Sequence, residues 1–268
     1  MSVARPSGKA NERTRPFDFI SGESAFSGAD LGRLSDAIHD ARSAWTASAS
    51  SLLSLVETGG DATFLTEQHC TFDHCAVLLF PRTLDAGLHH LEQQGLAPLP
   101  TVPSTVVRRR LSERYGLDPT EAGVHITRIR PELPDGRRHA SVEVFLFPRD
   151  SAAFDRDIEK SEVAHGFEQH TAFVCGRPDA AVLESLVTAW RAEAGLLWEG
   201  GGYNPHEGPR GSTVMYFVRD HARPARRRRF ELHCAGDLRE FTARIPRDTE
   251  AVRHAYTAWR RTEHVAHI

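Results

Sequence analysis

The sequence predicts an α+β fold made of two copies of one β-α-β-β-β unit. Two short stretches, FDHCAVLLF at 72–80 and EQHTAFVC at 168–175, share a histidine, one intervening residue, an alanine and an apolar run. When they are aligned on His74 and His170, the same elements follow in the same order in both halves. Self-similarity of this kind indicates a duplicated structural unit.

In each half the first strand is followed by a helix with an equivalent start and end. Thr83 and Asp179 are N-cap residues nine positions after the two histidines. Gly95 and Gly195 end the two helices. Between these limits apolar residues recur at helical spacing: Leu84, Leu88 and Leu91 in the first helix, and Val182, Leu183, Leu186, Val187 and Trp190 in the second.

A longer irregular stretch and then a hairpin complete each half. The hairpin strands are HITRIRPEL and SVEVFLF in the first half, and STVMYFV and RRFELHC in the second. Glu143 lies seven residues after the turn residue Gly136, and Glu231 lies seven residues after the turn residue Pro224. Each glutamate therefore belongs to the last strand of its half.

The rest of the chain divides around these two units. Residues 1–17 are polar and are expected to be disordered, and residues 18–66 form a helical segment with one broken helix or two between Asp30 and Val56. Gly59 and Gly60 end the helical stretch that begins at about Asp30. The first module is assigned to 67–150, the second to 151–238, and a C-terminal extension to 239–268. Its helix, from about Thr249, is expected to pack against the outside of the sheet.

Composition excludes several classes of partner. The chain has 268 residues, 40% of them hydrophobic, and a formal net charge of −3, which gives no electrostatic footprint for nucleic acid. It shows neither a signal peptide nor an apolar run of membrane length. The four cysteines form no C-x-x-C pair, so neither a zinc knuckle nor a disulfide framework is indicated. We expect a cytoplasmic protein with a small-molecule partner; its oligomeric state is left open.

The repeated histidines and glutamates form a candidate metal site. If the two modules pair through a pseudo-twofold axis, the first and last strands of each half meet on one concave face. Imidazole nitrogens and carboxylate oxygens suit Fe(II), Mn(II), Ni(II), Co(II) or Zn(II), and no thiolate is needed. The residues that would converge are His74, Glu143, His170 and Glu231.

Between about residues 70 and 238 this pattern resembles the vicinal oxygen chelate superfamily. In that superfamily paired βαβββ modules form a cup-shaped half-barrel around one metal. The resemblance implies that the first-strand histidine and the last-strand glutamate of each module are ligands. A chance pattern and a metal-free small-molecule binder are the alternatives.

The number of protein ligands separates two reaction classes. Four ligands leave two positions on an octahedral ion, which suits proton transfer and resembles glyoxalase or epimerase-type isomerases and lyases. His74, His170 and Glu231 alone form a facial triad that admits both a chelating substrate and dioxygen at Fe(II). The helical segment before residue 70, the histidine separation of 96 residues and the long inserts favour the dioxygenase. Glu143 fits the isomerase instead.

Two further residues lie beside Glu231 in the last strand. His233 shares its face and is either a donor to a ligand, a substrate acid or base, or simply part of the wall. Arg229, like Arg227, could neutralise Glu231 or hold a substrate carboxylate, although a solvated hairpin edge is the simpler interpretation.

The glycine-rich stretch EGGGYNPHEGPRGS at 199–212 is the last candidate region. Its glycines flank Tyr203, which would suit a lid over the open side of the metal or an ordinary exposed loop. Cys75 and Cys234 alternate away from the proposed ligands, so we expect them to be buried, inert thiols.

Overall fold

The computed structural model describes residues 24–55, 60–133, 136, 140–220 and 227–262. Among these residues, eight strands form one sheet in the order β2-β3-β4-β1-β5-β8-β7-β6. The order in the second half mirrors that in the first, as the predicted duplication requires. The strands are β1 (Cys70–Leu79), β2 (Val102–Pro103), β3 (His125–Ile129), β4 (Val142–Leu146), β5 (His170–Cys175), β6 (Leu196–Asn204), β7 (Ser212–Arg219) and β8 (Arg229–Ala235).

Each module contains the helix that the sequence predicts after its first strand. These helices are α4 (Leu84–Gln93) and α7 (Ala180–Ala192). The Thr83 hydroxyl accepts a hydrogen bond from the Ala86 N–H at 3.2 Å, and the Asp179 carboxylate accepts one from the Val182 N–H at 2.9 Å. Both residues are therefore true N-caps, which satisfy a helix-terminal N–H that would otherwise lack a partner.

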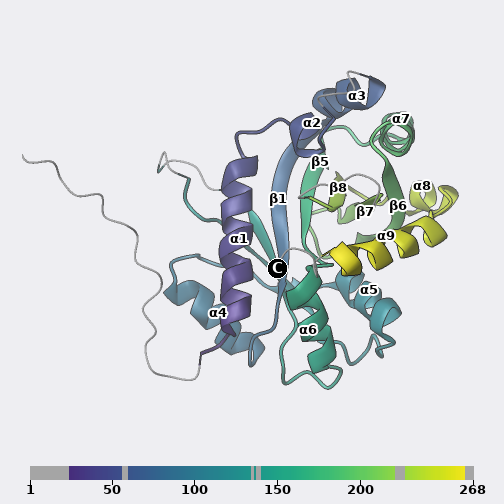
Figure 1. The fold of residues 1–268 in the computed structure, drawn as a ribbon. Coiled ribbons are helices and arrows are strands. Elements are labelled where there is room, and N and C mark those ends of the chain that lie inside the picture. The colour runs from purple at the N-terminus through teal and green to yellow at the C-terminus, as the bar shows by residue number, and fades with distance from the viewer. Residues whose placement is uncertain (1–23, 56–59, 134–135, 137–139, 221–226, 263–268) are drawn as a thin grey trace, which may run out of the picture.

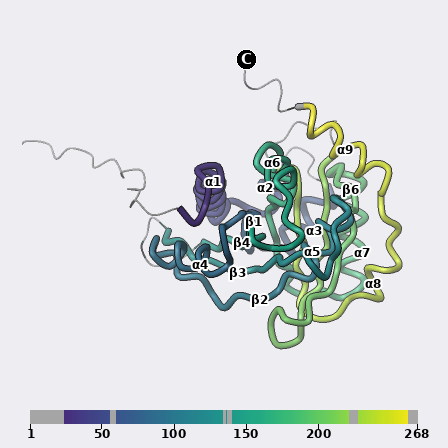
Figure 2. The backbone as a smooth tube through the Cα atoms, turned by 90° about the horizontal axis from the view of Figure 1, so that it is seen from below, coloured from purple at the N-terminus to yellow at the C-terminus, as the bar shows by residue number. Residues whose placement is uncertain are grey.

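The two modules join along one seam at the centre of the sheet. There β1 pairs with β5 in antiparallel orientation, while β4 runs parallel to β1 and β8 runs parallel to β5. The sheet curls into a half-barrel, and in Figure 2 its two halves lie side by side. The predicted α+β fold of paired βαβββ modules is confirmed.

Helices cover the outer face of the sheet, which is the face opposite to His74 and His170. Val77 and Leu79 of β1 pack in one apolar core with α1 (Gly28–Ala44) and α4. Phe230 and Leu232 of β8 pack in another core with α2 (Ala49–Leu52) and α7. Figure 1 shows α1 running beside β1. These cores fix the backbone of the strands that carry the candidate ligands.

Four of the described helices were not predicted from the sequence: α3 (Asp61–His69), α5 (Thr105–Tyr115), α6 (Arg156–His165) and the short α8 (Arg239–Arg244). Gly60 does not end the helical segment but is the N-cap of α3. The stretch expected to be irregular in the first module contains α5, and α6 lies between the modules. Apolar residues are few in α5, where only Val107 and Leu111 join a core, so its helical periodicity is weak.

Helix α5 belongs to the first module but reaches the second. The Arg109 guanidinium donates a hydrogen bond to the Gly201 carbonyl oxygen of β6 at 2.8 Å. On the inner face, Val107 and Leu111 pack with Phe145 and Phe147. The insert therefore fills part of the cup and ties the two modules together.

The C-terminal extension contains α8 (Arg239–Arg244) and α9 (Thr249–Thr262), which confirms the predicted helix. Its expected position outside the sheet is wrong. The Tyr256 hydroxyl donates to Glu199 at 2.6 Å, and Glu199 pairs with Arg229, whose guanidinium lies on the inner face. None of the described helices is long and apolar enough to span a membrane. The predicted disordered segment, residues 1–17, lies outside the described residues.

Candidate metal centre

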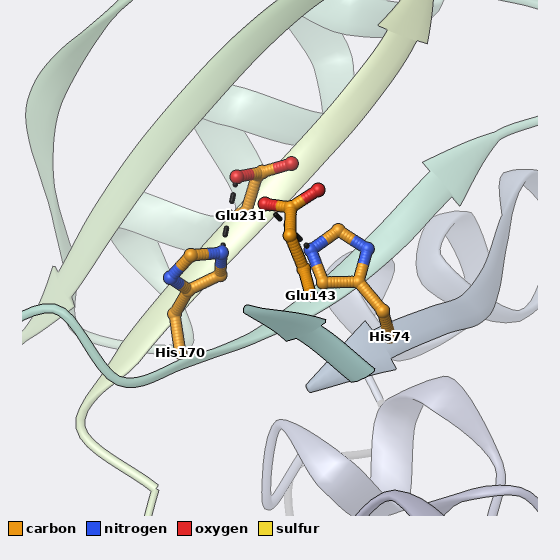
Figure 3. Close-up of side chains that lie close together, drawn as sticks. All are labelled: His74, Glu143, His170 and Glu231. Carbon is orange, nitrogen blue, oxygen red and sulfur yellow. Dashed lines mark ion pairs between the residues drawn. The ribbon is translucent and has the colours of Figure 1, made fainter. Parts of the chain in front are cut away.

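Four strands bring the predicted ligands to one place. His74 comes from β1, Glu143 from β4, His170 from β5 and Glu231 from β8. All four are buried, and one ligand atom from each lies within 4.8 Å of the ligand atoms of the others. Figure 3 shows the two imidazoles and the two carboxylates pointing toward a common centre. The predicted set therefore converges although its members are distributed over both modules.

Two alanines make this convergence sterically possible. Ala76 lies opposite both Glu143 and His170 in the strand pairing, and Ala172 lies opposite both His74 and Glu231. Directly opposed residues have β carbons only about 5 Å apart, so a large side chain at either alanine would occupy the space of an imidazole. The repeated H-x-A pattern thus places the histidine of each module against the alanine of the other.

Both imidazoles present the same nitrogen to the centre. His74 Nδ1 donates to Asp73 Oδ2 at 2.8 Å, and His170 Nδ1 donates to the Glu168 carbonyl oxygen at 2.9 Å. Each ring therefore turns an Nε2 lone pair inward, which is the arrangement that metal-binding histidines require.

The inward atoms lack partners within the described chain. His74 Nε2, His170 Nε2 and Glu231 Oε2 are buried without a hydrogen bond. The Nε2–Oε2 separations are 3.5 Å for His74 and Glu143 and 3.1 Å for His170 and Glu231. Buried polar atoms without partners are costly, and a divalent cation would satisfy all of them at once. The donor set fits a divalent metal.

Burial and charge affect the two histidine–glutamate pairs differently. Burial lowers the pKa of His170. Burial opposes the charge of Glu231, but the His170 imidazole close to it holds the pKa of Glu231 well below its usual range. This pair is ready to bind a cation as neutral imidazole and carboxylate. Burial raises the pKa of Glu143 despite His74 and Arg128 beside it, while the pKa of His74 is raised by Glu143 against the effect of burial.

Known proteins were compared with the chain and its fold. No family model and no curated protein sequence matches it. A methylmalonyl-CoA epimerase structure has a TM-score of 0.36 and 15% identity, covering 62% of this chain and 95% of its own. A mutant 4-hydroxymandelate synthase from Streptomyces coelicolor has a TM-score of 0.35 and 15% identity, covering 75% and 57%. A glyoxalase I mutant from Zea mays has a TM-score of 0.18 and 12% identity, covering 60% and 46%.

All three are vicinal oxygen chelate proteins. The feature that decides the fold is the chain's own topology, two mirrored βαβββ modules in a curled sheet. The chain therefore has a half-barrel fold of two paired βαβββ modules. This likeness concerns the fold, and the assignment of metal ligands rests on the convergence described above.

Within this half-barrel, Arg128 is a site residue that the sequence reasoning missed. It lies opposite Glu143 in the β3–β4 pairing and donates to Glu143 Oε1 at 3.1 Å. It also donates to Asp73 at 3.3 Å. Arg128 could have been found from the predicted hairpin, because it faces Glu143 once that register is known.

His233 lies two residues after Glu231 in β8, beside the four ligands, as expected. Its Nε2 is 3.3 Å from Glu207 Oε1. Although burial opposes protonation, Glu207 raises the pKa of His233 to about 9. The side chain therefore carries a proton at neutral pH, so it would act as a donor rather than as a base. Its catalytic role stays a prediction.

The structure pairs Arg229 with carboxylates other than Glu231. Its side chain is fully buried, so the simpler interpretation of a solvated hairpin edge is wrong for this arginine. The guanidinium pairs with Glu199 at 2.8 Å and Glu168 at 3.4 Å and lies over the Tyr216 ring. Its charge is balanced by these two glutamates rather than by Glu231.

Tyr203 is not brought to the four ligands by any described contact. It belongs to β6, and its hydroxyl donates to the Arg210 carbonyl oxygen at 3.1 Å. The neighbouring glycines belong to the paired part of the strand. At Gly201 a β carbon would collide with the Val214 carbonyl oxygen of the adjacent strand β7. A lid that begins at residue 199 is therefore wrong, since the connection between β6 and β7 comprises residues 205–211.

The cysteines take no part in the site. Cys75 and Cys234 are buried, as predicted, and both belong to outer-face cores. Cys70 and Cys175 are also buried and lie opposite each other in the β1–β5 pairing. The candidate centre therefore has only nitrogen and oxygen ligands among the described residues.

Proposed function

We propose that this protein is a divalent-metal enzyme whose small organic substrate chelates the ion through two adjacent oxygens. One observation carries the proposal: two imidazoles and two carboxylates, all buried, converge within 4.8 Å. A small-molecule partner, rather than nucleic acid, is part of the proposal. Fe(II), Mn(II), Ni(II), Co(II) and Zn(II) all suit this donor set.

Four protein ligands favour proton transfer in an isomerase or lyase. Such a set leaves two neighbouring positions on an octahedral ion, enough for a bidentate substrate. When bound, the cation would act as a Lewis acid that acidifies the C–H bond next to a chelating carbonyl. Glu143 is the best candidate for the base, because burial raises its pKa toward the range in which it can accept and return a proton. Arg128 would hold its Oε1 while the proton moves.

The Fe(II) dioxygenase expected from the sequence is the second candidate, and one observation favours it. Arg128 donates a hydrogen bond to Glu143 Oε1, so one of the two oxygens that this carboxylate could offer to the ion is already engaged. His74, His170 and Glu231 would then form the facial triad associated with non-haem Fe(II) oxygenases. The two candidates differ in whether Glu143 binds the ion.

Anaerobic reconstitution separates the candidates. The metal-free protein is loaded with each of the five metals, and the bound stoichiometry is measured. Solvent deuterium exchange into 2-oxo and 2-hydroxy acids without dioxygen is expected for an isomerase or lyase. Oxygen uptake by the Fe(II) form with 2-oxo acids or catechols is expected for a dioxygenase. A protein that binds none of the metals would contradict both.

Glu143→Gln provides the matched variant for this comparison. If Glu143 is ligand and base, the substitution weakens metal binding and abolishes exchange. If the triad operates, metal binding and oxygen uptake both survive. Glu113→Gln, at an exposed site on α5, is the control and should change neither property.

A further inference from the structure

The carboxylate of Glu207 lies between the two modules on the ligand-bearing face. Its Oε1 is 3.3 Å from His233 Nε2 in the second module and 3.7 Å from Arg128 Nη2 in the first. Its Oε2 accepts a hydrogen bond from the Ser212 hydroxyl at 2.6 Å. Glu207 comes from the 205–211 connection, so this contact links that loop to the candidate metal centre.

The same side of the centre is the one that reaches solvent. The side chains of Asp73, Arg128 and Glu207 are 24%, 25% and 25% exposed, whereas those of His74 and His170 are fully buried. Elsewhere on the inner face, apolar residues pack under α5 and paired charges surround Glu168. Arg128, His233 and Glu207 line the solvent-exposed side of the centre, and a substrate that enters there passes them.

Glu207 is a carboxylate in this entrance that is not a ligand of the proposed ion. Its Oε1 instead faces the Arg128 guanidinium and the His233 imidazole. Arg128 and His233 could bind another carboxylate in the same place, provided that it reaches between them. Arginine in particular binds carboxylates well.

We propose that the substrate carries a carboxylate in addition to its two chelating oxygens, and that this carboxylate replaces Glu207 between Arg128 and His233. The inference rests on the proposed function, whose metal site the substrate would occupy. Glu207 then acts as an internal substitute for the substrate anion. The 205–211 connection must move far enough to withdraw the Glu207 carboxylate. This movement breaks the hydrogen bond that the Ser212 hydroxyl donates to Glu207.

Matched pairs of acids test this proposal on the Mn(II)-loaded protein. One pair is 2-oxoglutarate and 2-oxopentanoate, and the other is malate and 2-hydroxybutanoate. Within each pair the chelating groups are identical and only the distal carboxylate differs. Dissociation constants are measured by calorimetry for the wild type, Glu207→Gln and Glu207→Ala. Metal stoichiometry is measured first for each protein.

Removal of the Glu207 charge is expected to strengthen binding of at least one dicarboxylate by about tenfold, while its monocarboxylate partner changes by less than about twofold. His233→Gln should remove most of that preference. Glu113→Gln should behave as wild type, because Glu113 is exposed on α5. Equal changes for both members of both pairs, or no change in any protein, would overturn the inference. If Mn(II) does not bind, the measurement is made with whichever of the five metals does bind, and failure to bind all five would instead refute the proposed function.

Discussion

Ala76 lies directly opposite His170 where the first strand of one module pairs with the first strand of the other. The equivalent pair, Ala172 and His74, has the same relationship. Each module therefore provides the space that the histidine of the other module occupies. This gives a physical reason for the H-x-A pattern to occur twice in one chain.

Ala76→Leu is expected to damage the metal centre. The larger side chain must share the space of the His170 imidazole, so metal affinity should fall by about 10–100-fold, as it does when groups supporting a metal ligand are changed. Overpacking should also cost about 1–3 kcal/mol of folding stability. Competition with a chromophoric chelator measures the affinity, and urea denaturation measures the stability.

Val77→Leu is the control for that prediction, because Val77 is buried on the outer face of the same strand. It should lower stability comparably but leave metal affinity unchanged. Equal losses of affinity in the two variants would mean that general destabilisation, and not crowding of His170, is responsible.

Asp73→Ala should weaken metal binding by about 10–100-fold, because only His74 loses the group that orients its ring. Asp73 accepts the Nδ1 proton of His74 and thereby keeps Nε2 free for the ion. His170 uses a backbone carbonyl for the same purpose, so no side-chain substitution can remove that support. Metal titration followed by NMR of the histidine nitrogens checks both statements. Asp36→Ala, an exposed position on α1, serves as the control.

The Glu168 carboxylate is expected to make folding stability depend on acid pH. Burial opposes its charge, but Arg110, Arg114 and Arg229 hold its pKa well below the ordinary value of 4.5. A pKa depressed by folding contributes stability above the unfolded value, and that contribution is lost as the pH falls below about 4.5. Glu168→Gln should cost about 3 kcal/mol at pH 7, because buried guanidinium charges lose their partner.

Urea unfolding of the wild type and Glu168→Gln between pH 7 and pH 3 measures this effect. The difference between the two proteins should shrink as the pH falls. A difference that is constant over this range would mean that folding does not lower the pKa of Glu168.

Parts of the fold that depend on local patterns could be predicted from the sequence. The first strand, the following helix and the closing hairpin of each module follow from alternation, helical spacing and capping residues, and the duplicated register aligned His74 with His170. Strands β2 and β6 lie in the stretches that were expected to be irregular. Helix α5 could not be predicted, because its short run of arginines lacks an apolar stripe. It is stabilised by contacts with distant segments, among them Arg110 with Glu168.

The candidate site was likewise predictable only where it depends on local or repeated sequence patterns. The four ligands were predicted because each repeats at a fixed position in its module. The environment of Arg229 was not, since its partners Glu168 and Glu199 lie 61 and 30 residues away. Glu207 belongs to the glycine-rich stretch at 199–212, and no local pattern marked it as a site residue. Only the folded chain places it beside residues of both modules.

All four cysteine thiols are expected to be unreactive in the native protein. Each is buried, which keeps a reagent from the sulfur, and burial raises the pKa of Cys70. The hydrogen bond between Cys234 and Cys175 raises the pKa of Cys234 and lowers that of Cys175, so the protection of Cys175 depends on its burial. A chromogenic disulfide reagent should therefore detect no thiol within minutes in buffer and four in denaturant. Rapid labelling of one thiol in the native protein would show that an outer-face core opens readily.

Anomalous scattering from crystals grown with Mn(II) or Co(II) tests the central claim most directly. Data collected at the absorption edge should show one strong peak at about 2.0–2.3 Å from Nε2 of both His74 and His170, with Glu231 and Glu143 completing the ligands. A metal-loaded crystal whose peaks all lie away from these side chains would contradict the account.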